Sequence, residues 1–161
     1  MNADGWLRRK GLQSLLLAGL VWQGLGARVA YAQRMNSGRL MTLEDMVRPI
    51  VKGAPVVKKE VTIEAPLLAD NGSLVPIQIQ VQSPMSEQDH VTHIYLLSQR
   101  NPVTQMAVFQ LGPWNGRAEV STRVRLAGTQ EVLALARLSN GEFRYKQMEI
   151  IVTESACVDA S

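Results

Sequence analysis

Alternation of hydrophobic and polar residues dominates the chain after Pro55. The clearest example runs from Val75 to Val81, where valine and isoleucine occupy every second position and proline or glutamine fills the rest. Strict alternation over a short run is typical of a strand with one buried face. The pattern therefore predicts a half-buried β-strand at residues 75–81.

Further segments of the same character follow at regular spacing, with turn-forming residues between them. Asn140-Gly141 is the strongest hairpin signal, since Asn-Gly suits a type I′ turn. About seven short strands separated by such turns predict an all-β fold, an immunoglobulin-like antiparallel β-sandwich. Besides 75–81, the expected strands lie at about 57–63, 91–99, 103–111, 117–126, 131–138 and 142–153.

Helical spacing appears only within residues 33–55, the lead-in to the strands. Thr42 followed three residues later by Asp45 resembles a capping box, which predicts a helix start. Pro49 limits this short N-terminal helix to a few turns. Its apolar face is expected to hold Leu43, Met46, Val47 and Ile50.

Residues 1–32 have the organisation of an export signal peptide. Arg8, Arg9 and Lys10 precede an apolar run of about 14 residues, which is too short for the roughly 20 that span a bilayer. Ala30-Tyr31-Ala32 supplies a small-x-small cleavage site, so the mature chain would begin at Gln33. Paired arginines favour the twin-arginine route into the periplasm. A general secretory signal with chance basic residues is the alternative.

Removal of this signal changes the charge of the protein. The whole chain has 17 basic and 14 acidic residues, of which four basic and one acidic lie in residues 1–32. The mature chain then carries 13 of each and has no formal net charge. The basic character belongs to the signal, so composition does not indicate nucleic-acid binding.

The only cysteine of the chain, Cys157, lies in a C-terminal tail at residues 154–161, after the last expected strand. A short tail of small residues is expected to be flexible and to hold this thiol outside the core. No internal disulfide can form from one thiol, and an unpaired cysteine in an exported protein indicates an intermolecular partner or a free reactive thiol.

The remaining sequence offers little catalytic chemistry. His90 and His93, the two histidines, are three apart in one expected strand, which places them on opposite faces and argues against a metal site. No nucleophile elbow, phosphate-binding loop or dinucleotide motif is present. Arg117, Arg123 and Arg125 are expected to form a solvated strand face, with an anion site as the alternative. We therefore expect no catalytic residue and no metal ligand.

In these features and in several short segments the chain resembles the SoxY family, the sulfur-carrier subunits of the bacterial thiosulfate-oxidising system. No single motif is diagnostic, but their order and spacing match from about Lys59 to Cys157. The matching segments are Glu64-Ala65-Pro66, Asn71-Gly72 with Val75-Pro76, Ser83-Pro84-Met85, Ile94-Tyr95, Asn101-Pro102, residues 118–126 and Thr129-Gln130.

The resemblance implies a non-catalytic periplasmic carrier without a cofactor of its own. Cys157 would hold sulfur intermediates covalently during thiosulfate oxidation. A SoxZ-like β-sandwich subunit would form a heterodimer with the carrier. A haem enzyme would load the thiol, and a hydrolase and a dehydrogenase would act on the bound sulfur. Neither nucleic acid nor a membrane span is expected.

The sequence departs from the family at the attachment site. The family tail has two glycines on each side of the cysteine, whereas Ser155 and Ala156 precede Cys157 here and Val158 and Asp159 follow it. These residues are stiffer than glycine, and the carboxylate disfavours a nearby thiolate. Two other interpretations therefore stay open: a SoxY-like subunit of another exported system without thiosulfate loading, and an unrelated immunoglobulin-like binding module.

Overall fold

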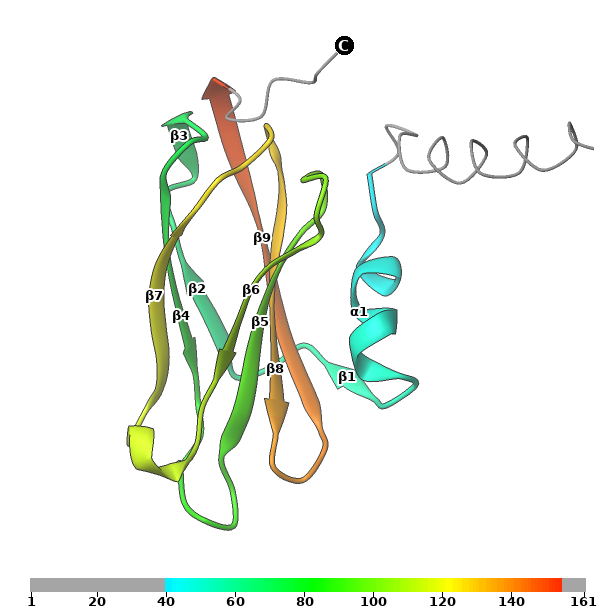
Figure 1. Cartoon of the computed structure of the whole chain (residues 1–161), viewed down its shortest axis with the longest axis vertical. Coiled ribbons are helices and arrows are strands. Elements are labelled where there is room, and N and C mark those ends of the chain that lie inside the picture. The colour runs from blue at the N-terminus through cyan, green and yellow to red at the C-terminus, as the bar shows by residue number, and fades with distance from the viewer. Residues whose placement is uncertain (1–39, 155–161) are drawn as a thin grey trace, which may run out of the picture. The chain divides into compact units, whose positions relative to one another are not determined.

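The structure, a computed structural model, describes residues 40–154. The expected signal peptide at 1–32, the start of the lead-in and the C-terminal tail from residue 155 lie outside the described residues. Nine strands in two sheets and one α-helix make up most of this part, which confirms the all-β sandwich (Figure 1). Within residues 40–154 no helix is both long and apolar enough to cross a membrane.

The two sheets differ in size and in how their edges end. The larger sheet has the order β1-β9-β8-β5-β6, with β3 pairing to β9 as well, and the smaller has the order β2-β4-β7. The strands are β1 (Val56–Val57), β2 (Val61–Glu64), β3 (Leu68–Asn71), β4 (Val75–Val81), β5 (Val91–Ser98), β6 (Gln105–Gln110), β7 (Ala118–Val124), β8 (Gln130–Leu138) and β9 (Phe143–Glu154).

Aliphatic side chains fill the space between the sheets. Ile77 and Ile79 of β4 meet Ile94 of β5 and Ile150 of β9 in one cluster, and all four are almost completely buried. The alternation at 75–81 appears directly as alternating burial along β4. Each such side chain contributes roughly 1.5–3 kcal/mol by leaving water, so this pattern holds the two layers together.

The helix α1 (Leu43–Val51) covers the outer face of the larger sheet. The hydroxyl of Thr42 accepts a hydrogen bond from the Asp45 backbone N–H at 3.2 Å, which confirms the expected helix start. Met46 and Val47 pack in a second cluster with buried side chains of β5, β8 and β9. The larger sheet is therefore buried on both faces over part of its area.

The expected first strand at 57–63 is two strands in two different sheets. β1 pairs in parallel with β9, whereas β2 pairs with β4. The chain changes sheet at Glu60, whose φ of 56° is in the left-handed region. Alternation along the sequence continues through this kink, so periodicity alone could not locate it.

The β8–β9 hairpin forms at Asn140-Gly141, but the turn is not the expected type I′. Type I′ needs positive φ at both residues, and of this pair only Gly141 has it, at 86°. The Gly141 N–H donates to the Leu138 carbonyl and the Leu138 N–H donates to the Glu142 carbonyl. This arrangement matches a tight turn followed by one left-handed residue, which requires glycine only once.

An ion-pair cluster holds the kinked segment before β2 against the β8–β9 hairpin. Glu142 Oε1 lies 2.9 Å from Arg144 Nε and 3.1 Å from Lys59 Nζ. Arg144 also pairs with Glu60 and donates to the Gln82 carbonyl at 3.3 Å. The hydrogen bond from Arg144, followed by that from Lys59, lowers the pKa of Glu142 below its ordinary value of 4.5.

We predict that Glu142→Gln lowers the stability and flattens its dependence on pH. A folded-state pKa below the unfolded one gives stability that is present above the unfolded pKa and is lost as the pH falls through the folded pKa. Urea unfolding from neutral pH to about pH 3 measures this difference. Glu149→Gln, a change at an exposed position of β9, is the control. Equal pH profiles for the two variants would contradict the prediction.

Candidate functional site

The structural lead to a site is the end of β9, from which the chain continues toward Cys157. Glu154 is the last residue of β9, and Cys157 follows three residues later, outside the described residues. The flanking residues Ser155, Ala156, Val158 and Asp159 lie outside them too. The geometry therefore describes how the tail is attached to the sandwich, at what we call the tail root: residues 151–154 and the segments bonded to them.

The short strand β3 fixes one side of the tail root. It runs parallel to the end of β9, with Leu68 opposite Ile151 and Asn71 opposite Glu154. The Thr153 hydroxyl donates to the Asp70 carbonyl at 2.7 Å, and the Gly72 N–H donates to the Glu154 carbonyl at 2.8 Å. The last residue of β9 is thus held in the sheet.

The loop between β7 and β8 holds the other side of the tail root. The Thr129 hydroxyl accepts a hydrogen bond from the Val152 N–H at 3.0 Å and lies 3.4 Å from the Val152 carbonyl, to which it donates. The Leu126 N–H in this loop donates to the Gly72 carbonyl at 2.8 Å. β3 and β9 are therefore bonded to the loop that joins the two sheets.

Asn101 connects a third segment, the β5–β6 loop, to this end of the sandwich. Its Nδ2 donates to the Arg125 carbonyl at 2.8 Å. Its Oδ1 accepts from the Ala127 N–H at 2.9 Å and from Gln130 Nε2 at 3.0 Å. The Asn101 side chain thus links the β5–β6 loop to the β7–β8 loop.

Two buried polar side chains, those of Ser98 and Gln130, form hydrogen bonds with Asn101. Ser98 and Gln130 are the two buried polar side chains among the described residues, and Ser98 Oγ donates to Gln130 Oε1. The same Oε1 accepts from the Arg100 N–H at 3.0 Å, and Ser98 Oγ accepts from the Asn101 N–H at 2.9 Å. Each group has a partner, as buried polar groups require.

Several segments that carry the family resemblance meet in this network. Asn71-Gly72, Asn101 and Thr129-Gln130 are far apart in the sequence and come together around the tail root. The sequence alone marks them as matching segments and gives no indication that they meet. In the sequence, the only indication of a role is that these polar residues lie at the ends of hydrophobic strands. Which of them bond to each other depends on the tertiary fold.

The surface around the tail root combines apolar and basic side chains. Leu67, Leu68, Leu74 and Ile151 are 48–70% exposed, and we call them the tail-root apolar patch. At the same end, Arg100, Arg123 and Arg125 are exposed and form no ion pair within residues 40–154. The solvent exposure expected for Arg123 and Arg125 is thus observed.

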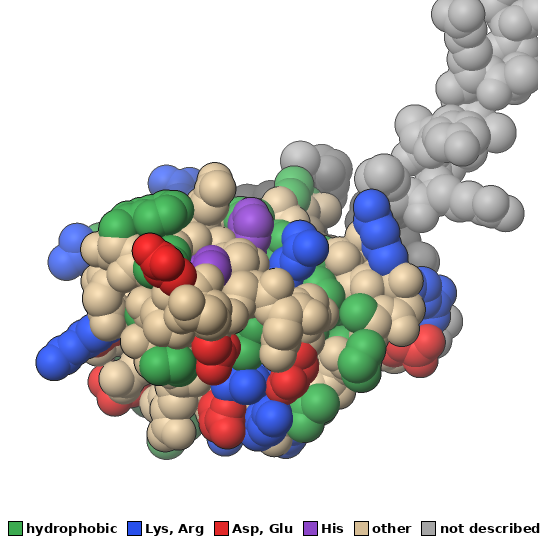
Figure 2. Space-filling model, turned by 90° about the horizontal axis from the view of Figure 1, so that it is seen from below, with side chains coloured by type: hydrophobic (Ala, Val, Ile, Leu, Met, Phe, Trp, Pro, Cys, Tyr) green, Lys and Arg blue, Asp and Glu red, His purple; other side chains and the backbone are tan. Residues whose placement is uncertain are grey.

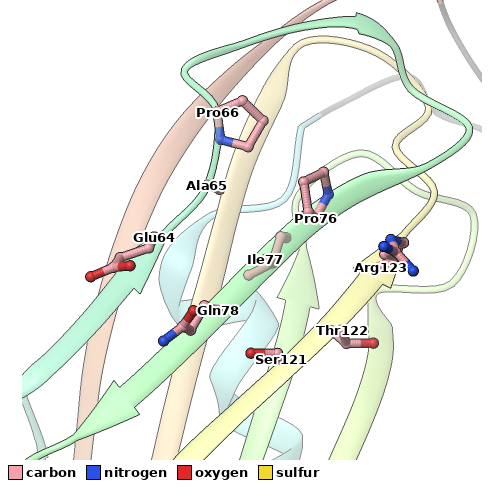
Figure 3. Close-up of a pocket in the computed structure, with 9 residues that line it drawn as sticks. All are labelled: Glu64, Ala65, Pro66, Pro76, Ile77, Gln78, Ser121, Thr122 and Arg123. Carbon is pink, nitrogen blue, oxygen red and sulfur yellow. The ribbon is translucent and has the colours of Figure 1, made fainter.

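Two shallow depressions flank Arg123. One, of about 520 Å³, lies beside the outer face of the smaller sheet, with Glu64 and Arg123 on opposite sides and Pro66 and Pro76 between them (Figure 3). The other, of about 480 Å³, lies between β7 and the β5–β6 loop and includes Arg125. Both are open, and nothing in them assembles a catalytic group.

The histidines lie at the opposite end of the sandwich, which Figure 2 shows from below with acidic and basic side chains interspersed. His93 is in β5 and stacks on Tyr95, whereas His90 precedes the strand and its Nδ1 lies 3.0 Å from the Ser86 carbonyl. Among the described residues no three His, Cys, Asp or Glu side chains group as a metal site.

Chain geometry separates His93 from the thiol. His93 lies opposite Arg137, which pairs with Phe143 at the start of β9. Eleven residues of β9 then span about 36 Å to Glu154, whereas three extended residues beyond it span at most about 11 Å. Within one chain a Cys157–His93 catalytic pair is therefore too far apart.

Comparison with known proteins identifies the family. The sequence matches the family described as sulfur oxidation protein SoxY over residues 47–157, a span that ends at Cys157. The chain belongs to the SoxY family. A search of curated proteins found no match.

Solved structures agree with this membership. The sulfur carrier protein SoxY from Chlorobium limicola f thiosulfatophilum has 25% identity and a TM-score of 0.58, with 68% of this chain and 90% of that chain covered. A superoxide reductase (neelaredoxin) from Ignicoccus hospitalis has 12% identity and a TM-score of 0.55, covering 64% and 97%. A putative superoxide reductase from Thermotoga maritima has 22% identity and a TM-score of 0.52, with 71% of this chain and 99% of that chain covered. The two reductases share the fold alone.

We predict that Gln130→Ala destabilises this SoxY-family chain by about 1–3 kcal/mol, because it leaves Ser98 and the Arg100 N–H without their buried partner. Urea unfolding measures the loss. Gln80→Ala, at an exposed position of β4, is the matched control and should have little effect. A change in Gln130→Ala no larger than that in the control would show that the buried network contributes nothing.

Proposed function

We propose that this protein is a non-catalytic periplasmic sulfur carrier that holds sulfur intermediates covalently on Cys157 during thiosulfate oxidation. The observation that carries the proposal is the family match, which extends over the sandwich and ends at the single cysteine. The solved carrier from Chlorobium limicola, to which the chain is similar, supports it.

The tail root suits a carrier. The polar bonds of β3 and Thr129 hold Glu154 in place, so Cys157 is attached to a rigid support by three residues. The thiol can therefore reach at most about 11 Å from Glu154, which keeps it close to this end of the sandwich. An enzyme that acts on the thiol must therefore approach this end of the molecule.

The tail-root apolar patch and the exposed side chains of Arg100, Arg123 and Arg125 would form the surface that such an enzyme meets. Leu67, Leu68 and Ile151 are adjacent across the β3–β9 pairing. Exposed apolar groups contribute to association when they leave water. Arg100 and Arg125 on the same end would attract an anion such as thiosulfate toward the tail.

The chemistry of loading follows from the thiol. The Cys157 sulfur forms a bond to the outer sulfur of thiosulfate, giving a protein S–S–SO₃⁻ adduct, and one proton and two electrons leave. A haem enzyme of the Sox system would accept the electrons. A hydrolase would then add water and release sulfate with a proton, leaving a persulfide that a dehydrogenase oxidises. The carrier supplies the sulfur atom and the support, while its partners supply the catalysis.

The same proposal includes the location and the permanent partner. Residues 1–32 would direct export, by the twin-arginine route, and residues 33–55, 56–153 and 154–161 would be lead-in, sandwich and tail. A SoxZ-like β-sandwich subunit would form a heterodimer with the carrier. The core of the described residues is almost entirely aliphatic, and burial of further surface against a subunit would stabilise it.

We predict that Cys157 acquires sulfur adducts in a host grown on thiosulfate. Intact-protein mass spectrometry of the exported protein should show mass increases for added sulfur or for a thiosulfonate group. Reductant should remove them, and Cys157→Ser should lack them. A free, unmodified thiol in the wild-type protein under these conditions would refute the covalent carrier role.

A second prediction concerns the residues that flank the thiol. Replacing Ser155, Ala156, Val158 and Asp159 together with glycine should increase the rate of adduct formation by a Sox haem enzyme, since the backbone becomes freer and the carboxylate is removed. Loading in vitro, followed by mass spectrometry, measures the rate. Asp159→Asn alone separates the charge from the stiffness. If neither variant is loaded, the interpretation as a subunit of another exported system is favoured.

A further inference from the structure

Two exposed arginines at the end of β7 have no counter-charge beside them. Arg123 and Arg125 are two positions apart, and Arg123 lies opposite Pro76 of β4, whose side chain has neither a charge nor a polar group. Among the described residues neither guanidinium forms an ion pair. Two neighbouring cations repel each other, and a bound anion removes that repulsion.

Both arginines line one of the two depressions that flank Arg123. This depression, of about 480 Å³, lies between β7 and the β5–β6 loop, and we call it the arginine pocket. No aspartate or glutamate is among the described residues that line it. The other depression differs, since Glu64 faces Arg123 across two prolines (Figure 3). The arginine pocket is therefore the one of the two whose charge suits an anion.

The backbone beneath the two arginines is held in place by the tail-root network. Asn101 Nδ2 donates to the Arg125 carbonyl at 2.8 Å, and Asn101 Oδ1 accepts from the Ala127 N–H at 2.9 Å. Val124, between the arginines, is buried and pairs with Val75 of β4. Because the backbone is fixed, only the two side chains must be ordered when they bind one anion, which lowers the entropic cost.

The side of the arginine pocket that faces β7 is apolar. Val103 of the β5–β6 loop lines it together with Met106 and Ala107 of β6. Met106 is partly buried against the core, and its thioether is soft and polarizable. Thiosulfate has a charged sulfonate end and a soft sulfur end, so it can satisfy both sides. Sulfate has oxygen at every corner and would place a charged oxygen against the apolar side.

The arginine pocket is close to the start of the tail. The Gly72 N–H donates to the Glu154 carbonyl at 2.8 Å, and the Gly72 carbonyl accepts from the Leu126 N–H at 2.8 Å. Hydrogen-bonded neighbouring segments lie about 4.8 Å apart, which places Leu126 roughly 10 Å from Glu154. Arg125 is the residue before Leu126. Since three extended residues span at most about 11 Å, Cys157 can approach an anion held by Arg125.

We propose that the arginine pocket is a non-covalent binding site for a sulfonate group, in which Arg123 and Arg125 hold the –SO₃⁻ end of thiosulfate. The choice of thiosulfate rests on the proposed carrier function, whereas the preference for an anion with one soft end rests on the residues that line the pocket. The sulfonate can come from free thiosulfate or from the adduct carried on Cys157. Both sources present the same charged end to the arginines.

The first test measures binding of free thiosulfate when no chemistry at the thiol can occur. Isotope-labelled, exported Cys157→Ser protein is titrated with thiosulfate at constant ionic strength, and NMR follows the backbone amides. The amide signals of residues 122–125 should shift and saturate. Thiosulfate should bind more tightly than sulfate, and chloride should leave these signals unchanged.

Arginine variants of the same Cys157→Ser protein decide whether the pocket is the site. Arg123→Gln and Arg125→Gln should each weaken thiosulfate binding up to about 5-fold, the upper range for an exposed ion pair. Arg117→Gln is the matched control, because Arg117 is exposed and lies about 20 Å from Arg123, at the other end of β7. It should bind as the parent does. Absence of saturable shifts, or equal weakening in all three variants, overturns the proposal.

The second test uses the adduct on Cys157. The Cys157 thiolate of the wild-type protein attacks tetrathionate, whose central S–S bond breaks. Thiosulfate leaves with the electron pair, and a Cys–S–S–SO₃⁻ group remains on the protein. This group should shift the amide signals of residues 122–125 and weaken binding of added thiosulfate. Arg125→Gln should reduce these shifts, while mass spectrometry shows the same adduct.

The two tests together distinguish the sources of the sulfonate. Shifts from the free anion alone assign the arginine pocket to incoming thiosulfate, and shifts from the adduct alone assign it to the carried group. Shifts from neither overturn the proposal. If Cys157 forms no adduct, the carrier function fails, and the binding measured in Cys157→Ser still decides whether the arginine pocket is a sulfonate site.

Discussion

The pairing of β3 with the end of β9 is the constraint on which the functional part of the molecule depends. β9 is the longest strand, and its final residues extend beyond the strand that precedes it in the hairpin. Without β3 on one side and Thr129 on the other, residues 151–154 would have no bonding partners in the sheet. With them, the sheet continues to within three residues of Cys157, and the origin of the tail is fixed.

The ends of the sandwich have different chemistry as a consequence. The tail root has a network of amide and hydroxyl groups below an apolar and basic surface. The opposite end has the histidines, the hairpin turn and the ion-pair cluster around Arg144. Because about 36 Å of β9 separate these ends, the thiol has no titratable histidine of its own chain within reach. A carrier that relies on partner enzymes is consistent with this separation.

The two edges of the larger sheet also differ. One edge is covered by β1 and β3, and this same covering holds the tail root. The other edge, β6, has neither a covering strand nor protective charges among the described residues. The β9 edge is therefore the one that fixes where the tail begins.

The sequence by itself determined the elements whose signals are local. Alternation at 75–81 fixes which face of β4 is buried, and Thr42 places the helix start because its hydroxyl bonds within the same turn. Family membership also follows from sequence, although Cys157 and its flanking residues lie outside the described part of the chain. In both of these local cases, the residues whose pattern predicts the element are also the residues that interact to form it.

Only the tertiary structure decided the features that depend on distant partners. β3 is a strand because it bonds to β9 some eighty residues later, and it lies between 63 and 75, where no strand was expected. Glu60 ends one strand and starts another because the chain passes between sheets, which alternation does not record. Gln130 is buried although polar, since Ser98 and Asn101 satisfy its amide. The attachment of the tail therefore rests on long-range hydrogen bonds, which local sequence patterns do not encode.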